Sequence, residues 1–172
     1  MMDTSPLLRP VRHILVAAVL AAVAATGLVS ANTTAASAST SAVAAALPAM
    51  STDSYEQQVQ YWINVRRNQH GLGRLTLASC TDNVAENWGS YLASTGKFEH
   101  QSMTTILNRC NAYYAGETLG RGAISPKLLV YLWMHSPAHR EVLLSPHARR
   151  IGIGAYPDRL GQWVVAADFM KL

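Results

Sequence analysis

The aromatic residues of this 172-residue chain are confined to one part of it: all thirteen lie between Tyr55 and Phe169. Aromatic side chains bury large apolar surfaces and dominate protein cores. The first 54 residues contain none and consist mainly of Ala, Val, Ser and Thr. A packed core therefore has to form after this segment, over about 120 residues, which is enough for one small domain.

Residues 1–31 have the pattern of a secretory signal peptide. Arg9 and Arg12 form a short basic region, and Ile14–Val29 follows as sixteen residues without a charge. Val29-Ser30-Ala31 supplies small residues of the kind that signal peptidase recognises. The uncharged run is rich in Ala and shorter than the ~20 residues needed to cross a bilayer. We therefore expect cleavage rather than a membrane anchor.

The segment that follows is predicted to be a linker. Residues 32–50 are mostly Ala, Ser and Thr, a composition with little to pack. Cleavage is expected after Ala31 or, alternatively, after Ala38. The mature protein would then be extracellular, with no membrane span and with its folded domain over 51–172.

Export changes the interpretation of the two cysteines, Cys80 and Cys110, which are the only ones in the chain. An oxidising compartment favours a disulfide between them. The alternative, a reactive thiol pair, is expected in a C-x-x-C motif or beside activating charges, and this spacing offers no such motif. A bridge closing a loop of about 30 residues would stabilise the domain by roughly 3.5 kcal/mol in the chain-entropy model.

The charge pattern gives little support to nucleic-acid binding. Only 14% of the residues are charged, and the formal net charge is +4. Basic doublets occur at Arg66-Arg67 and Arg149-Arg150. Proteins that bind nucleic acid usually gather basic residues in a stripe with interleaved aromatic residues. We therefore interpret the doublets as solvated surface and expect no nucleic-acid partner.

The hydrophobic periodicity predicts helices first and strands last. Helical spacing, cap residues and Pro at first-turn positions mark the helices, whereas apolar alternation marks a C-terminal antiparallel hairpin. The predicted helices cover 55–69, a segment from Thr81 or Asp82 to Ser94, 102–109, a segment opening at Pro126 and a short one opening at Pro137. The predicted hairpin covers 151–155 and 163–169, and the Gly-rich stretch 115–122 is predicted to be a loop. This order indicates an α+β domain with helices stacked on a small antiparallel sheet.

Few residues in the domain suggest chemistry by themselves. His100, Glu117 and His139 are predicted on loops or helix starts, where functional sites concentrate, but each alone is more typical of ordinary surface or of a local hydrogen-bonding group. His135 and His139 have the spacing of metal ligands on one helical face, yet Pro137 interrupts the helix between them. The chain contains no H-E-x-x-H motif, no G-x-S-x-G motif and no phosphate-binding G-x-x-x-x-G-K motif.

The order of the short fragments is more specific than any one of them. In sequence order they are Ile63-Asn64-Val65-Arg66-Arg67, Gly71-Leu72-Gly73-Arg74-Leu75, Phe98-Glu99-His100, Ala115-Gly116-Glu117-Thr118, Trp133-Met134-His135-Ser136-Pro137-Ala138-His139-Arg140, Ile151-Gly152-Ile153-Gly154 and Asp168-Phe169. This series resembles the CAP superfamily, also called the SCP domain, in its bacterial secreted form. The resemblance covers roughly 54–170, and the segment with Trp, Ser-Pro and His-Arg is its strongest part.

The resemblance implies an α-β-α sandwich with an open cleft. In some members of the family, His and Glu side chains in the cleft bind a divalent metal, often zinc. His100, Glu117 and His139 match those positions, and three N/O ligands plus water suit an open zinc site. The chain departs from the family pattern in having Thr118 where the motif has Asn. It also has His135 or Ser136 where animal and plant members have a second Glu, so His135 is a further candidate ligand.

Three functions are compatible with the sequence. The favoured one is a secreted module that binds a lipid, a cell-wall fragment or a protein in its His/Glu cleft. The second is a metal-assisted, peptidase-like hydrolase with Glu117 as the catalytic base. The third is a structural secreted domain with a vestigial cleft, because a fold does not determine a function.

Overall fold

The computed structural model describes residues 50–172. The predicted signal peptide, 1–31, and the predicted linker, 32–50 apart from residue 50, lie outside the described residues. The helices are α1 (Thr52–Gln69), α2 (Ser79–Thr95), α3 (Met103–Cys110), α4 (Pro126–His135) and α5 (Pro137–Leu143). The strands are β1 (Thr76–Leu77), β2 (Tyr114–Gly122), β3 (Arg150–Pro157) and β4 (Trp163–Lys171).

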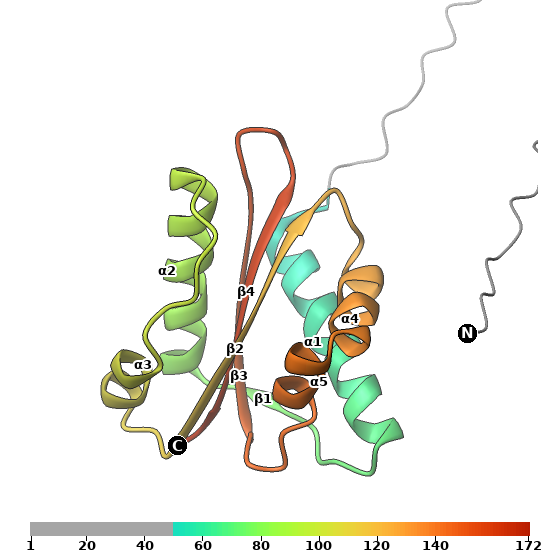
Figure 1. Cartoon of the computed structure of the whole chain (residues 1–172), viewed down its shortest axis with the longest axis vertical. Coiled ribbons are helices and arrows are strands. Elements are labelled where there is room, and N and C mark those ends of the chain that lie inside the picture. The colour runs from blue at the N-terminus through green and yellow to red at the C-terminus, as the bar shows by residue number, and fades with distance from the viewer. Residues whose placement is uncertain (1–49) are drawn as a thin grey trace, which may run out of the picture. The chain divides into compact units, whose positions relative to one another are not determined.

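The elements form three layers, as the α-β-α prediction requires. Helices α2 and α3 cover one face of the sheet, and α1, α4 and α5 cover the other (Figure 1). The α+β class is therefore confirmed. Within the described part of the chain, no helix is both long and apolar enough to cross a membrane.

The sheet has the strand order β1-β3-β4-β2. The pairs β3–β4 and β4–β2 are antiparallel, and the predicted C-terminal hairpin is confirmed. The short β1 pairs with β3 in parallel, so the sheet is mixed rather than purely antiparallel. Strand β2 forms one edge of the sheet, which leaves its outer side open to side chains from both helical layers.

The prediction of a loop over 115–122 is wrong, because this stretch is β2. Its glycines mark close packing rather than a turn. A Cβ atom on Gly120 would lie 2.4 Å from Cδ1 of Leu129 on α4. The indole Nε1 of Trp133, also on α4, donates a hydrogen bond to the Leu119 carbonyl at 2.8 Å. The glycine therefore lets α4 approach the strand.

Helix α1 begins as its sequence predicts. Ser51 is the N-cap, and its hydroxyl accepts a hydrogen bond from the Ser54 N–H. Such caps satisfy one of the free amides of the first turn. The helix ends at His70, and Gly71 follows with a φ of 70°. The helix buries a stripe of apolar side chains against the sheet, Tyr55, Val59 and Ile63.

Helix α2 begins earlier than predicted, at Ser79 rather than after Thr81 or Asp82. Its N-cap residue, Ala78, provides no side-chain hydrogen bond. The helix lies directly against β3, because a Cβ on Gly152 would come within 2.2 Å of the Thr81 carbonyl oxygen. The glycines of Ile151-Gly152-Ile153-Gly154 thus allow α2 to pack closely on β3. This packing, rather than a capping side chain, determines where α2 lies.

The predicted disulfide between Cys80 and Cys110 is confirmed. It joins the first turn of α2 to the last residue of α3, with the two Cα atoms 5.7 Å apart. The bridge therefore ties the two helices of one layer together and fixes both ends of the segment between them.

The prediction that both basic doublets are solvated is wrong for Arg67, which is 1% exposed. Its guanidinium donates to four backbone carbonyl oxygens, those of Gly73, Leu143, Ser145 and Ala148, at 2.8–3.4 Å. These carbonyls belong to the segment after α1, to the last residue of α5 and to the connection between α5 and β3. A buried arginine is tolerated here because its donors are satisfied.

Candidate functional site

Two acidic side chains face each other across the paired strands β2 and β4. Glu117 and Asp168 are register partners, and both are buried, at 6% and 0% exposure. Register partners in an antiparallel pair project from the same face of the sheet. Their neighbours two residues along, Leu119 and Ala166, pack in a cluster with Leu92 of α2. The two carboxyl groups therefore project toward the layer that contains α2.

The loop between α2 and α3 brings two polar side chains to these acids. The loop is held to β2 by Arg121, which donates to the Gly96 and Lys97 carbonyls at 3.2 and 2.8 Å. It is held to α2 by Trp88, whose Nε1 donates to the Glu99 carbonyl at 3.1 Å. These contacts place the next two residues, His100 and Gln101, over the end of the acidic pair.

The His100 ring is oriented by Glu117. The distance from His100 Nδ1 to Glu117 Oε1 is 2.5 Å. The His100 side chain is 59% exposed, whereas the Glu117 side chain is 1% exposed. A buried carboxylate therefore holds the inner nitrogen of the ring and leaves Nε2 as the nitrogen available to a ligand.

Gln101 links the two acids through a single amide group. Its Nε2 donates to Glu117 Oε2 at 2.8 Å and lies 3.2 and 3.0 Å from the two Asp168 carboxyl oxygens. Its backbone N–H also donates to Glu117 Oε1 at 3.3 Å. The loop residue therefore supplies most of the donors that the acids receive.

We call His100, Gln101, Glu117 and Asp168 the acidic group. Burial dominates the electrostatics of its two carboxyl groups. It raises the pKa of Asp168 to about 8, the negative charge of Glu117 adds to this effect, and the Gln101 hydrogen bond opposes it. Burial also raises the pKa of Glu117, against the lowering effect of its hydrogen bonds to Gln101 and His100. Two adjacent buried carboxylates repel each other. The pair therefore takes up a proton at a higher pH than two exposed carboxyl groups would.

An apolar hollow of about 340 Å³ lies at the β2 edge, beside this group. His139 of α5 lines it, and burial followed by the charge of His100 lowers the pKa of His139. The two histidines are therefore close enough to interact, although they come from opposite layers. The other lining residues are Phe98, Leu119, Gly120, Arg121, Ile124, Leu129, Leu132, Trp133 and Ser136. We call this hollow, together with His100, the cleft.

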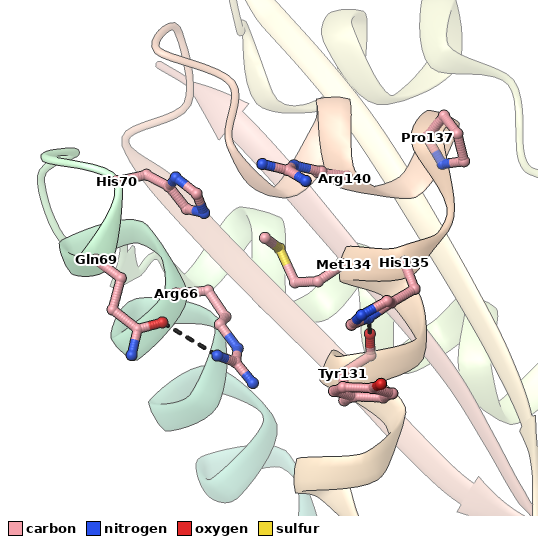
Figure 2. A pocket seen from close by; sticks show the side chains of 8 residues that line it. All are labelled: Arg66, Gln69, His70, Tyr131, Met134, His135, Pro137 and Arg140. Atoms are coloured by element: carbon pink, nitrogen blue, oxygen red, sulfur yellow. Dashed lines mark hydrogen bonds between the residues drawn. The ribbon is translucent and has the colours of Figure 1, made fainter.

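His135, the further candidate ligand, lies elsewhere. Its Nδ1 is 2.7 Å from the Tyr131 carbonyl oxygen, and the two rings contact each other at a tilt of 35°, with centroids 3.9 Å apart. It lines a different hollow, between α1 and the α4–α5 pair (Figure 2). The structure thus places His100 on Glu117, His139 across the cleft, and His135 outside it.

Sequence reasoning did not include two members of the group, Gln101 and Asp168, among the candidate residues. Asp168 carries a signal, because it is the one acidic residue in an otherwise apolar strand. A buried acid needs partners, so its position alone could have marked the site. Gln101 carries no comparable signal, because its role depends on the path of a loop.

The group does not form a ready metal centre. Within residues 50–172, no three His, Cys, Asp or Glu side chains are arranged to hold one metal ion. The carboxyl oxygens of Glu117 and Asp168 accept hydrogen bonds from Gln101, and His100 Nδ1 faces Glu117. A zinc ion held by His100, Glu117 and His139 would require these contacts to rearrange, so the metal site stays a prediction.

Comparisons with known proteins agree with this architecture. Among curated proteins, the uncharacterised protein YkwD of Bacillus subtilis is 29% identical over 111 residues, 60% of this chain. That stretch is 43% of the length of YkwD, so the chain corresponds to less than half of this relative.

Solved structures share the fold. An extracellular SCP-domain protein from Bacillus anthracis has a TM-score of 0.59 and 23% identity, over 70% of this chain and 41% of its own. A cysteine-rich secretory protein from Staphylococcus aureus has a TM-score of 0.60 and 20% identity, over 73% and 41%. An outer surface protein from Borrelia burgdorferi has a TM-score of 0.59 and 21% identity, over 67% and 90%.

A family profile identifies the chain as well. The CAP profile, described as the cysteine-rich secretory protein family, matches residues 60–167. This range runs from within α1 to within β4 and includes the disulfide, Glu117 and the residues of the cleft. The chain belongs to the CAP, or cysteine-rich secretory protein, family.

Proposed function

We propose that this protein is an exported binding module whose cleft holds a ligand with an apolar body and a hydrogen-bonding group. The hollow offers an apolar lining that includes Phe98, Leu129 and Leu132. His139 also lines it, and His100 lies near enough to interact with His139. Small-molecule sites commonly combine an apolar lining with a few fixed polar groups. A lipid, a cell-wall fragment and an apolar segment of a protein are the ligand classes that fit this chemistry.

One observation carries the proposal: a mostly exposed histidine is held in place by a buried carboxylate. A surface histidine without a partner would sample several rotamers. The His100–Glu117 contact removes that freedom, and the loop is tied down on both sides. A side chain fixed in advance loses less entropy when it binds a ligand.

The alternative of a hydrolase with Glu117 as base is less well supported. The Glu117 side chain is buried behind His100 and Gln101, so it positions His100 rather than contacting a substrate. Both cysteines are in the disulfide, so neither is a thiol nucleophile. The proposal therefore assigns no catalytic step to these residues.

A ligand screen tests the binding function. The purified protein is screened by thermal shift against fatty acids, sterols, peptidoglycan fragments and apolar peptides, because a ligand of the native state raises its melting temperature. We expect a hit whose shift is lost in His100→Ala and reduced in Glu117→Gln. His147→Ala, which removes an exposed histidine of the α5–β3 connection, is the matched control and should keep the shift. The proposal would be contradicted if every variant showed the same melting-temperature shift, or if no ligand class produced a shift. The domain would then be a structural one with a vestigial cleft.

Export is supported by three observations. The solved relatives include proteins described as extracellular, secretory and outer-surface. The Cys80–Cys110 bridge is typical of oxidising compartments, and the opening 31 residues resemble a signal peptide. Amino-terminal sequencing of protein recovered from the culture medium tests the proposal. The expected start is residue 32 or residue 39, and retention of the intact chain inside the cell would contradict it.

A further inference from the structure

A second hollow, of about 480 Å³, lies between α1 and the α4–α5 pair, and its lining is basic. Figure 2 shows Arg66 and His70 on the α1 side and His135 and Arg140 on the other. The remaining lining residues are Gln69, Tyr131, Met134 and Pro137, so no acidic side chain lines it.

This hollow is separate from the cleft. Trp133, Ser136 and His139 line the cleft, whereas Met134, His135, Pro137 and Arg140 line the basic hollow. The same two helices therefore present different side chains to two sites. A ligand of the basic hollow would not contact the His100–Glu117 pair.

The arginines of the hollow have N–H groups without a hydrogen-bond partner in the described residues. One nitrogen of the Arg66 guanidinium donates to Gln69 Oε1 at 3.1 Å, but its Nε is buried with no hydrogen-bond partner. None of the ion pairs within residues 50–172 involves Arg66 or Arg140. A buried donor without an acceptor is unfavourable, so a ligand rich in acceptor oxygens would be favoured here.

The positive charge continues past the hollow. A neighbouring depression shares Arg66 and Tyr131 with it and adds Lys127. The Lys127 ammonium lies 4.8 Å from the centre of the Trp62 ring, which holds it near the groove without neutralising it. Three cations, from α1, α4 and α5, therefore border two adjacent depressions.

We propose that this basic hollow binds a phosphate group. Guanidinium groups from two helices can each offer two parallel N–H donors, a geometry that matches the oxygens of a phosphate. A phosphate carries several acceptor oxygens and as much as two negative charges, so it suits several separate donors better than a single carboxylate does. The group could belong to a free phosphate or to a phospholipid headgroup, and the experiment separates these sources.

The test uses the full-length protein and three probes: inorganic phosphate, glycerol 3-phosphate, and vesicles of phosphatidylcholine with or without phosphatidylglycerol. Calorimetry measures the first two, and co-sedimentation measures the vesicles. We expect saturable binding that weakens at least tenfold in the double variant Arg66→Gln/Arg140→Gln. Soluble probes that bind indicate a free phosphate ligand. Binding only to vesicles with phosphatidylglycerol indicates a headgroup.

Arg109→Gln is the matched control for the single variant Arg140→Gln, because Arg109 is exposed on α3, in the opposite layer, and each change removes one positive charge. It should bind every probe as the unchanged protein does. Circular dichroism checks folding, and Arg140→Gln alone, at an exposed position, tests the site without disturbing the core. The proposal is overturned if no probe binds saturably, or if Arg109→Gln weakens binding as much as the double variant. His100→Ala should leave phosphate binding intact, so this test does not depend on the cleft.

Discussion

Gln101 Nε2 lies within hydrogen-bond distance of both Glu117 and Asp168, and these two acids are register partners on β2 and β4. One amide nitrogen thus serves two buried carboxyl groups that would otherwise repel each other. The arrangement links the loop that carries His100 to the middle of the sheet. The conformation of His100 therefore depends on the protonation and pairing of the acids beneath it.

This relationship predicts that Gln101→Ala destabilises the domain. The change removes donors from two buried acids, and hydrogen bonds to charged groups are worth about 1.5–3 kcal/mol each. We expect the free energy of unfolding to fall by about 2 kcal/mol in urea denaturation. The loss should be smaller in an Asp168→Asn background, where the charge repulsion is absent. Equal losses in both backgrounds would show that Gln101 does not couple the acids.

Glu56 of α1 makes the stability of the domain depend on pH. Its Oε1 accepts the Ala155 N–H of β3 at 2.8 Å. Burial raises its pKa to about 7, with smaller contributions from the charges of Glu86, Asp82 and Asp53. The folded state therefore holds a proton that the unfolded chain releases near the ordinary value of 4.5. This contribution to stability is full below that value and is lost as the pH rises toward 7.

Glu56→Gln tests the dependence, because the amide oxygen can still accept the Ala155 N–H but the side chain no longer ionises. We expect the free energy of unfolding to decline less between pH 4.5 and 7 than in the unchanged protein. Glu141→Gln, at an exposed position on α5, serves as the control and should keep the original slope. Identical slopes for all three proteins would exclude Glu56 as the source.

Gly152→Ala should destabilise the domain by separating α2 from β3. The added Cβ would lie 2.2 Å from the Thr81 carbonyl oxygen, and a backbone atom cannot move aside as a side chain can. Overpacking of this kind costs about 1–3 kcal/mol or more. Gly73→Ala is the control, because nothing lies within 4 Å of its added Cβ. Thermal unfolding of both variants measures the difference, and a similar melting temperature for the two would be inconsistent with the close approach.

Arg67→Lys should be severely destabilising although it preserves the charge. The guanidinium reaches the Gly73 carbonyl with Nε and the Leu143 and Ser145 carbonyls with a terminal nitrogen. A single ammonium cannot serve both sides. We expect a loss of about 3 kcal/mol, measured by urea denaturation, because buried carbonyls lose their donors. The exposed Arg74 gives the control Arg74→Lys, with little change expected; a small loss at position 67 would mean that water replaces the guanidinium.

Much of the fold follows from patterns within short segments. Ser51 and the spacing of Tyr55, Val59 and Ile63 mark α1, and the alternation in 151–155 and 163–169 marks the β3–β4 hairpin. The cysteine count and the predicted export signal suffice to predict the bridge between Cys80 and Cys110. The helix and the hairpin depend on residues close in sequence. The bridge is the one pairing that two cysteines in a chain allow.

The strand β2 shows where such reasoning fails. Its glycines suggest a turn, but Gly116 and Gly120 lie at positions where side chains of Val142 and Leu129 come close. The need for a small residue comes from a neighbour far away in the sequence. The same holds for Arg67, whose partners lie in the loops before β1 and β3.

The sequence by itself determined the α+β class and the disulfide, and its resemblance to the CAP family singled out His100 and Glu117, which the structure brings into contact. Only the tertiary structure decided that Gln101 and Asp168 complete the acidic group, that His139 reaches the cleft and that His135 lines the basic hollow instead. The physical reason is that a local sequence pattern reflects only the interactions within one segment of the chain. The pairing of β2 with β4, and the packing of α4 and α5 across the sheet, set which distant side chains share a site.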